Sequence, residues 1–146
     1  MSNTQRGWIW LAAGLGAAYF GWTNRRLFFV NDITTGESAA YPALRSRVYY
    51  VEISQAMTAA EQALSRLPGW KVLSQDAEND LIEASAKSVL GADDVTIYFF
   101  SLGLGQVRVT IRSRAQNGLG DLGRNAAHIR QLQAAMDDRL DTGAAF

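Results

Sequence analysis

An uncharged run of 18 residues near the N-terminus, from Gly7 to Asn24, sets the first limit on how this chain can fold. As one continuous helix it would be about 27 Å long, close to the hydrocarbon thickness of a bilayer, roughly 30 Å. Aromatic side chains favour the headgroup level, and they occur at both ends of the run, at Trp8, Trp10, Tyr19, Phe20 and Trp22. The run therefore predicts one N-terminal transmembrane helix.

Three other interpretations of the run are less favoured. A cleaved signal peptide would end in small residues, whereas this run ends in the bulky sequence YFGWTN. A buried core helix is not normally aromatic at both ends, and an interfacial helix would need a polar face. Arg25 and Arg26 after the run, against Arg6 before it, favour a cytoplasmic C-terminal domain and leave a periplasmic one open. We therefore expect a single-pass protein of the cell inner membrane.

Small residues recur four positions apart along the predicted span, which lets a second helix approach closely. The residues expected at such a helix–helix contact are Ala12, Gly14, Gly16, Ala17 and Gly21. The alternative is that glycine and alanine are simply frequent in membrane helices.

Composition excludes several classes of function. Residues 1–30 carry three arginines and no acid, and the remainder carries 11 basic and 14 acidic residues, so the domain has a net charge of −3. Nucleic acid requires a strongly basic surface, so we expect no nucleic-acid partner. The chain has no cysteine and one histidine, which excludes thiolate chemistry and makes a histidine-based catalytic triad or metal cluster implausible. We predict no cofactor and no metal.

The rest of the chain predicts a small α+β domain. We expect an anchor over residues 1–30, a linker over 31–47 and one domain over 48–146, with elements in the order β-α-β-β-β-β-α. The expected strands cover 48–53, 70–74, 81–87, 94–102 and 106–114; a helix follows Ser54, and a second follows Asp121. An antiparallel sheet with both helices packed on one face is the simplest arrangement.

Several short sequences then follow one another in a fixed order. They are PGW ending at Trp70, IEA at 82–84, Asp93-Asp94, RSR at 112–114 and GDLGRN at 120–125. Over roughly residues 48 to 140 they resemble a widespread family of domains of unknown function, DUF1499. The resemblance implies a fold more than an activity, and it implies structural roles for Trp70, Asp93, Asp94, Asp121 and Asn125.

The chain departs from that family in two places. It lacks the cysteine of a Cys-Pro segment that often precedes the domain, and it reads RAQNGLG before the DLG motif. Members resembling the family occur in bacteria and chloroplast-bearing lineages, often behind a membrane anchor or export signal. The distribution suggests a photosynthetic or respiratory setting.

Three arginines fall on one face of the strand expected at 106–114. Side chains alternate across a strand, so Arg108, Arg112 and Arg114 point away from Val107, Val109 and Ile111. Such a row could bind a carboxylate or phosphate. Alternatively, the arginines pair with Glu83, Asp93, Asp94 or Asp121 and fix the loops, which is the favoured interpretation.

Other constellations give weaker signals. Asp93, Asp94 and Asp121 could hold a hard cation, but an Asp that caps a helix already uses its oxygens on backbone N–H groups. The GLGDLG segment matches no phosphate-binding fingerprint. His128 is expected on the polar side of the last helix, without a chemical role.

The favoured hypothesis is a non-enzymatic accessory or assembly subunit of a larger membrane complex, with other transmembrane subunits as partners. The alternative is a membrane-tethered module that binds a small anionic ligand through Arg108, Arg112 and Arg114. A hydrolytic enzyme is the least favoured hypothesis, since no nucleophile–base pair is evident.

Overall fold

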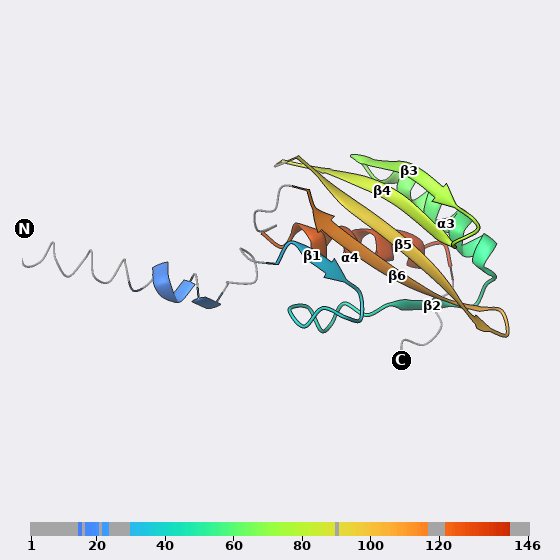
Figure 1. The fold of residues 1–146 in the computed structure, drawn as a ribbon, viewed down its shortest axis with the longest axis horizontal. Helices are drawn as coiled ribbons and strands as arrows, with labels where there is room; N and C mark the ends of the chain where they lie inside the picture. The colour runs from blue at the N-terminus through green and yellow to red at the C-terminus, as the bar shows by residue number, and fades with distance from the viewer. Residues whose placement is uncertain are drawn as a thin grey trace, which may run out of the picture.

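The computed structural model describes residues 15, 17–20, 22–23, 30–89, 91–116 and 122–140. From residue 30 onward it forms strands and helices in a mixed order (Figure 1). They are β1 Asp32–Thr34, β2 Arg47–Tyr49, α3 Ile53–Arg66, β3 Trp70–Asp76, β4 Leu81–Ser88, β5 Gly91–Gly103, β6 Gln106–Ala115 and α4 Arg124–Asp137.

All strand pairings among these elements are antiparallel, and the sheet order is β1-β6-β5-β4-β3, with β2 also paired to β6. Strand β1 pairs with residues 112–114 of β6, and β2 pairs with residues 107–109. The two short strands therefore lie end to end along the same edge of β6. The loop that joins them, residues 35–46, turns out from that edge.

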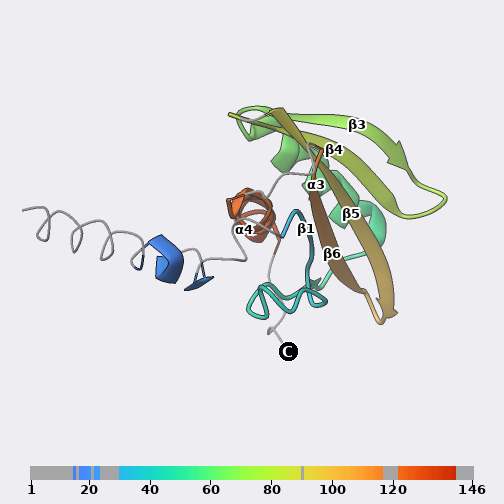
Figure 2. The same cartoon turned by 60° about the vertical axis from the view of Figure 1, so that its left-hand side comes forward.

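Both helices cover one face of the sheet and leave the other face open (Figure 2). On β4, Ile82, Ala84 and Ala86 are buried beneath the helices. On β6 the alternate positions Val107, Val109 and Ile111 are buried in the same way. Apolar burial on one face of an antiparallel sheet is the main stabilising term in such a fold. The predicted α+β class, an antiparallel sheet with two helices on one face, is confirmed.

The segment expected to be a linker is part of this fold. Ile33 of β1 and Leu44 of the following loop are buried in the core. The backbone N–H of Thr35 donates to the carbonyl of Ile111 at 3.0 Å, and the N–H of Ile111 donates to the Thr35 hydroxyl at 3.0 Å. Strand β1 was not predicted from the sequence, because three residues are too few to show a period.

Both helices begin at positions other than those expected. Glu52, not Ser54, precedes α3, and its backbone N–H donates to Gln55 Oε1 at 3.1 Å, as in a capping box. Helix α4 begins at Arg124, after Gly123 in the left-handed conformation. Asp121, the expected cap, lies outside the described residues.

Across the residues that the structure describes, none of the helices combines the length and the apolar character that a bilayer crossing requires. The predicted transmembrane helix over Gly7–Asn24 is therefore wrong, and so is the assignment as a single-pass inner-membrane protein. A span needs about 20 apolar residues in one helix. The run lacks charge, but only four of its residues are the Leu, Ile, Phe or Val that strongly favour insertion.

The small residues proposed for helix–helix contact fall on this same segment. Ala12, Gly14, Gly16 and Gly21 lie outside the described residues, and Ala17 is exposed in a short helical piece. The structure therefore gives no partner surface for these positions.

Candidate functional site

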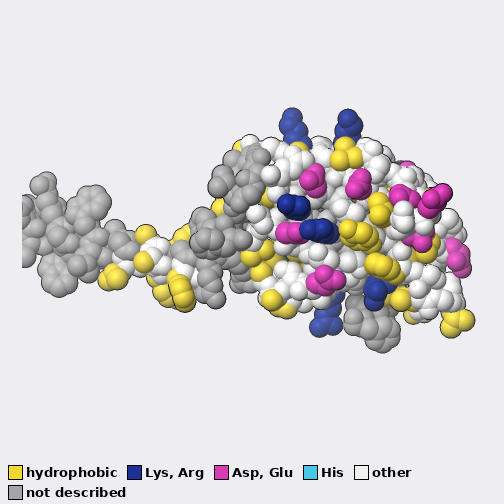
Figure 3. Space-filling model, viewed as in Figure 1, with side chains coloured by type: hydrophobic (Ala, Val, Ile, Leu, Met, Phe, Trp, Pro, Cys, Tyr) yellow, Lys and Arg dark blue, Asp and Glu magenta, His cyan; other side chains and the backbone are white. Residues whose placement is uncertain are grey.

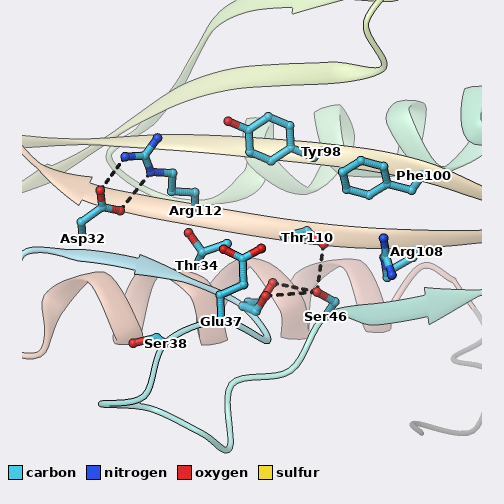
Figure 4. A pocket seen from close by; sticks show the side chains of 11 residues that line it. Asp32, Thr34, Glu37, Ser38, Ser46, Tyr98, Phe100, Arg108, Thr110 and Arg112 are labelled. Carbon is cyan, nitrogen blue, oxygen red and sulfur yellow. Dashed lines mark hydrogen bonds and ion pairs between the residues drawn. The ribbon is translucent and has the colours of Figure 1, made fainter.

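The open face of the sheet carries basic, acidic and apolar side chains close together (Figure 3). A hollow of about 730 Å³ lies on this face, between strands β5 and β6 and the loop that follows β1 (Figure 4). Its volume is in the range of small-molecule sites, about 300–1,000 Å³. Its lining residues are Asp32, Thr34, Thr35, Glu37, Ser38, Ser46, Tyr98, Phe100, Arg108, Thr110 and Arg112.

Hydroxyl groups form the floor of the hollow. The Ser46 hydroxyl lies 2.9 Å from the Thr110 hydroxyl and 3.1 Å from the Thr35 hydroxyl. These bonds connect strand β6 to both ends of the 35–46 loop. Because the loop is held at both ends, it forms a fixed wall of the hollow.

Arg112 stands at one end of the hollow and is paired with Asp32 of β1. Its Nε donates to Asp32 Oδ1 at 3.0 Å, and its Nη2 donates to Oδ2, so the contact is bidentate. The hydrogen bond from Arg112 holds the pKa of Asp32 below its ordinary value, and the same bond raises the pKa of Arg112. The positive charge of Arg112 in the hollow is therefore balanced by Asp32.

Arg108 stands at the other end and has different surroundings. Its guanidinium lies 5.0 Å from the centre of the Phe100 ring, in a cation–π contact. The Phe100 ring is stacked on that of Tyr98, with centres 6.4 Å apart and planes 22° apart. Within the described part of the chain, no carboxylate lies within 4.0 Å of Arg108. Among the described residues, this arginine therefore has no ion-pair partner in the hollow.

Glu37 reaches into the hollow from the loop after β1 (Figure 4). Its carboxylate makes no hydrogen bond or ion pair with any other residue in the described ranges. Within the part of the chain that the structure describes, Glu37 is therefore an anion without an ion-pair partner, and it lines the same hollow as Arg108.

Arg114 lies outside this hollow, although it continues the row. It lines a smaller depression of about 310 Å³ together with Arg112, Glu83 and Asp94. Glu83 accepts a hydrogen bond from the Ser74 hydroxyl at 2.7 Å, and Asp94 accepts one from Gln116 Nε2 at 2.7 Å. Glu83 and Asp94, two of the acids expected to neutralise the arginines, are thus hydrogen-bonded to other residues, and Asp32 pairs with Arg112 instead.

Asp93 is turned away from the open face and is almost completely buried. Its Oδ1 lies 3.3 Å from Arg124 Nη2, and its Oδ2 lies 3.4 Å from His128 Nδ1. The His128 ring packs edge-on against Trp70, with centres 5.4 Å apart. The side chain of His128 is only 12% exposed, so it is largely buried, although it was expected on the polar side of the helix. The cluster joins the start of α4 to β5, and we assign it a structural role.

Asn125 is also fully buried and joins three elements of the fold. Its Oδ1 accepts from the Ser113 hydroxyl at 2.8 Å, and its Nδ2 donates to the Asn31 carbonyl at 2.9 Å. Asp94 faces the opposite side of the sheet from this network. The structure thus separates Trp70, Asp93 and Asn125, which lie on the helix side, from the arginine row.

Of the residues that line the hollow, only Arg108 and Arg112 were among the candidates from sequence. Asp32, Glu37 and Ser46 all lie in the segment expected to be a linker. Their signal in the sequence is weak, because only the polar–apolar–polar alternation of Asp32, Ile33 and Thr34 hints at a strand. The contact of this segment with β6 bridges about 80 residues and has no local signature.

Comparison with known proteins identifies the family. The family model "Protein of unknown function (DUF1499)" matches residues 29–136. No curated protein matches the chain significantly. Among solved structures, the crystal structure of TTHA0849 from Thermus thermophilus is similar, with a TM-score of 0.39 and 10% identity, covering 74% of this chain and 95% of that chain. Since the family model covers well over half of the sequence, in agreement with the motifs from Trp70 to Asn125, the chain belongs to the DUF1499 family.

Proposed function

We propose that the domain is a non-enzymatic binding module that holds a small ligand by an anionic group in the hollow of the open sheet face. The observation that carries this proposal is Arg108, a cation without a carboxylate partner in the described chain, which lines a concavity of about 730 Å³. An unpaired guanidinium in a concave site is suited to a carboxylate or phosphate, which it can bind through two parallel N–H donors.

The surroundings of Arg108 support binding rather than catalysis. The described lining residues include no histidine, and the hydroxyls of Thr35, Ser46 and Thr110 bond one another. Asp32 is committed to Arg112, so it is not available as a base at its ordinary pKa. The expected role as an accessory subunit depended on the membrane anchor, so the binding module is the function we put forward.

The test is ligand-induced thermal stabilisation of the purified full chain. A panel of monocarboxylates, dicarboxylates and phosphomonoesters is screened against the wild type, then against Arg108→Ala and the double variant Arg108→Ala/Arg112→Ala. A ligand at a hundred times its Kd stabilises the folded state by about 2.7 kcal/mol, so loss of the site is readily measured.

The matched control is Arg114→Ala, which removes the same charge from the same strand face outside the hollow. We expect the control to keep the stabilisation and the Arg108 variants to lose it. Equal stabilisation of the wild type and the double variant would exclude this function.

A further inference from the structure

The charges around the hollow divide into a balanced pair and an unbalanced pair. Asp32 and Arg112 neutralise one another through two hydrogen bonds. Arg108 and Glu37 also line the hollow, but they form no ion pair with each other, so their charged atoms are more than 4.0 Å apart. The hollow thus presents one available positive and one available negative group at separate points.

This arrangement discriminates against ligands with a single charge. A simple anion held by Arg108 would also face the carboxylate of Glu37, and a simple cation held by Glu37 would face Arg108. Like charges across a binding site disfavour the wrong ligand, and that penalty is a source of specificity. A ligand that carries both charges meets an opposite charge at each end.

The positions of the side chains agree with a dipolar ligand. Figure 4 shows Glu37 rising from the loop on one side of β6, with Tyr98 and Phe100 on the other side and Arg108 toward one end. Because Arg108 already lies over the Phe100 ring, a cationic group of the ligand would be bound at Glu37 and not at that ring. The hydroxyl floor supplies further donors and acceptors between the two charged ends.

We propose that the ligand is a small zwitterion, an amino acid or short peptide, whose carboxylate is bound by Arg108 and whose ammonium is bound by Glu37. This assignment rests on the proposed function and adds the second charge of the ligand to it.

The test uses the dipeptide L-alanyl-L-phenylalanine, its N-acetyl form and its C-terminal amide, with binding measured by isothermal titration calorimetry on the full chain. We expect the free dipeptide to bind at least tenfold more tightly than either blocked form. Glu37→Gln should abolish the preference over the acetylated form, and Arg108→Gln should abolish the preference over the amide. Glu78→Gln removes an exposed carboxylate in the β3–β4 turn and should leave all three affinities unchanged.

The outcomes separate this inference from the proposed function. If the acetylated dipeptide binds as tightly as the free one and both depend on Arg108, the zwitterion assignment is wrong and the anion site stands. If the dipeptides do not bind while simple carboxylates bind through Arg108, the assignment is equally wrong. If no probe of either panel binds, both proposals fall.

Discussion

Replacement of Asn125 by alanine tests whether the start of α4 is held to the sheet by its buried amide. Asn125 is fully buried and bonds the Ser113 hydroxyl at 2.8 Å and the Asn31 carbonyl at 2.9 Å. Ser113 is itself fully buried on β6, whereas Asn31 is partly exposed. The two ends of the amide therefore differ in what their loss would cost.

The expected decrease in the free energy of unfolding follows from the exposure of Ser113 and Asn31. In Asn125→Ala the Ser113 hydroxyl is stranded away from water, at a cost of about 1–3 kcal/mol, whereas the Asn31 carbonyl can bond water instead, at about 1 kcal/mol. The higher helix propensity of alanine returns about 0.5 kcal/mol. We therefore expect Asn125→Ala to lower the free energy of unfolding by about 2–3 kcal/mol.

Urea denaturation followed by far-ultraviolet circular dichroism measures this change. Arg130→Ala, an exposed position on the same helix, is the control and should stay within about 0.5 kcal/mol of the wild type. The double variant Ser113→Ala/Asn125→Ala no longer contains the unpaired hydroxyl. Its free energy of unfolding should therefore fall by about 1 kcal/mol less than the sum of the decreases in the two single variants. A loss below about 1 kcal/mol for Asn125→Ala would refute the reasoning.

Three further predictions concern other contacts. The hydroxyl of the buried Tyr49 donates a hydrogen bond to Asp137 at 2.7 Å. Tyr49→Phe should therefore lower the free energy of unfolding by about 1–2 kcal/mol, measured by thermal denaturation, and an unchanged value would show that the bond is dispensable. Arg112 lowers the pKa of Asp32, so this pair stabilises the fold above the ordinary carboxyl pKa and is lost as the pH falls through the lower folded value. Asp32→Asn should therefore flatten the pH dependence of stability below about pH 4, by less than about 1 kcal/mol because the pair is exposed, and an unaltered acid profile would contradict it. Leu104 is fully exposed with a φ of 54°, so Leu104→Gly should stabilise the β5–β6 turn by about 1 kcal/mol, and a lower Tm would contradict the strain.

Much of the domain could be predicted from its residue pattern. The alternation along β6 predicts that Arg108 and Arg112 share one face and that Val107 and Val109 share the other, because successive side chains on a strand point to opposite sides. The helix that ends ahead of the Pro-Gly pair at 68–69 was predicted from its own apolar spacing. The apolar period is a local property, so it can be read without knowledge of the fold.

The N-terminal prediction was wrong because it did not rest on an apolar period. The run Gly7–Asn24 was interpreted from its lack of charge and its aromatic ends, which are properties of composition. Neither property requires one unbroken, strongly apolar helix, and the described residues contain no helix of that kind.

Only part of the candidate site could be predicted before the fold was known. Arg108 and Arg112 could be named in advance, because their spacing on one strand is local. Their surroundings could not be predicted, because Asp32, which pairs with Arg112, and Glu37, which lines the same hollow, come from a segment more than 70 residues earlier in the chain. That segment has no period of its own and is ordered by its bonds to the edge of β6.

By itself the sequence determined that helices α3 and α4 and strands β3 to β6 form, and which face of β4 and of β6 is apolar, since these depend on neighbours a few positions away. Only the tertiary structure decided that Arg112 is balanced by Asp32 while, among the described residues, Arg108 and Glu37 remain unpaired. The physical reason is that charge pairing depends on distances of a few ångströms between segments remote in the chain, and those distances are set by how β1 and β2 pack along the sheet.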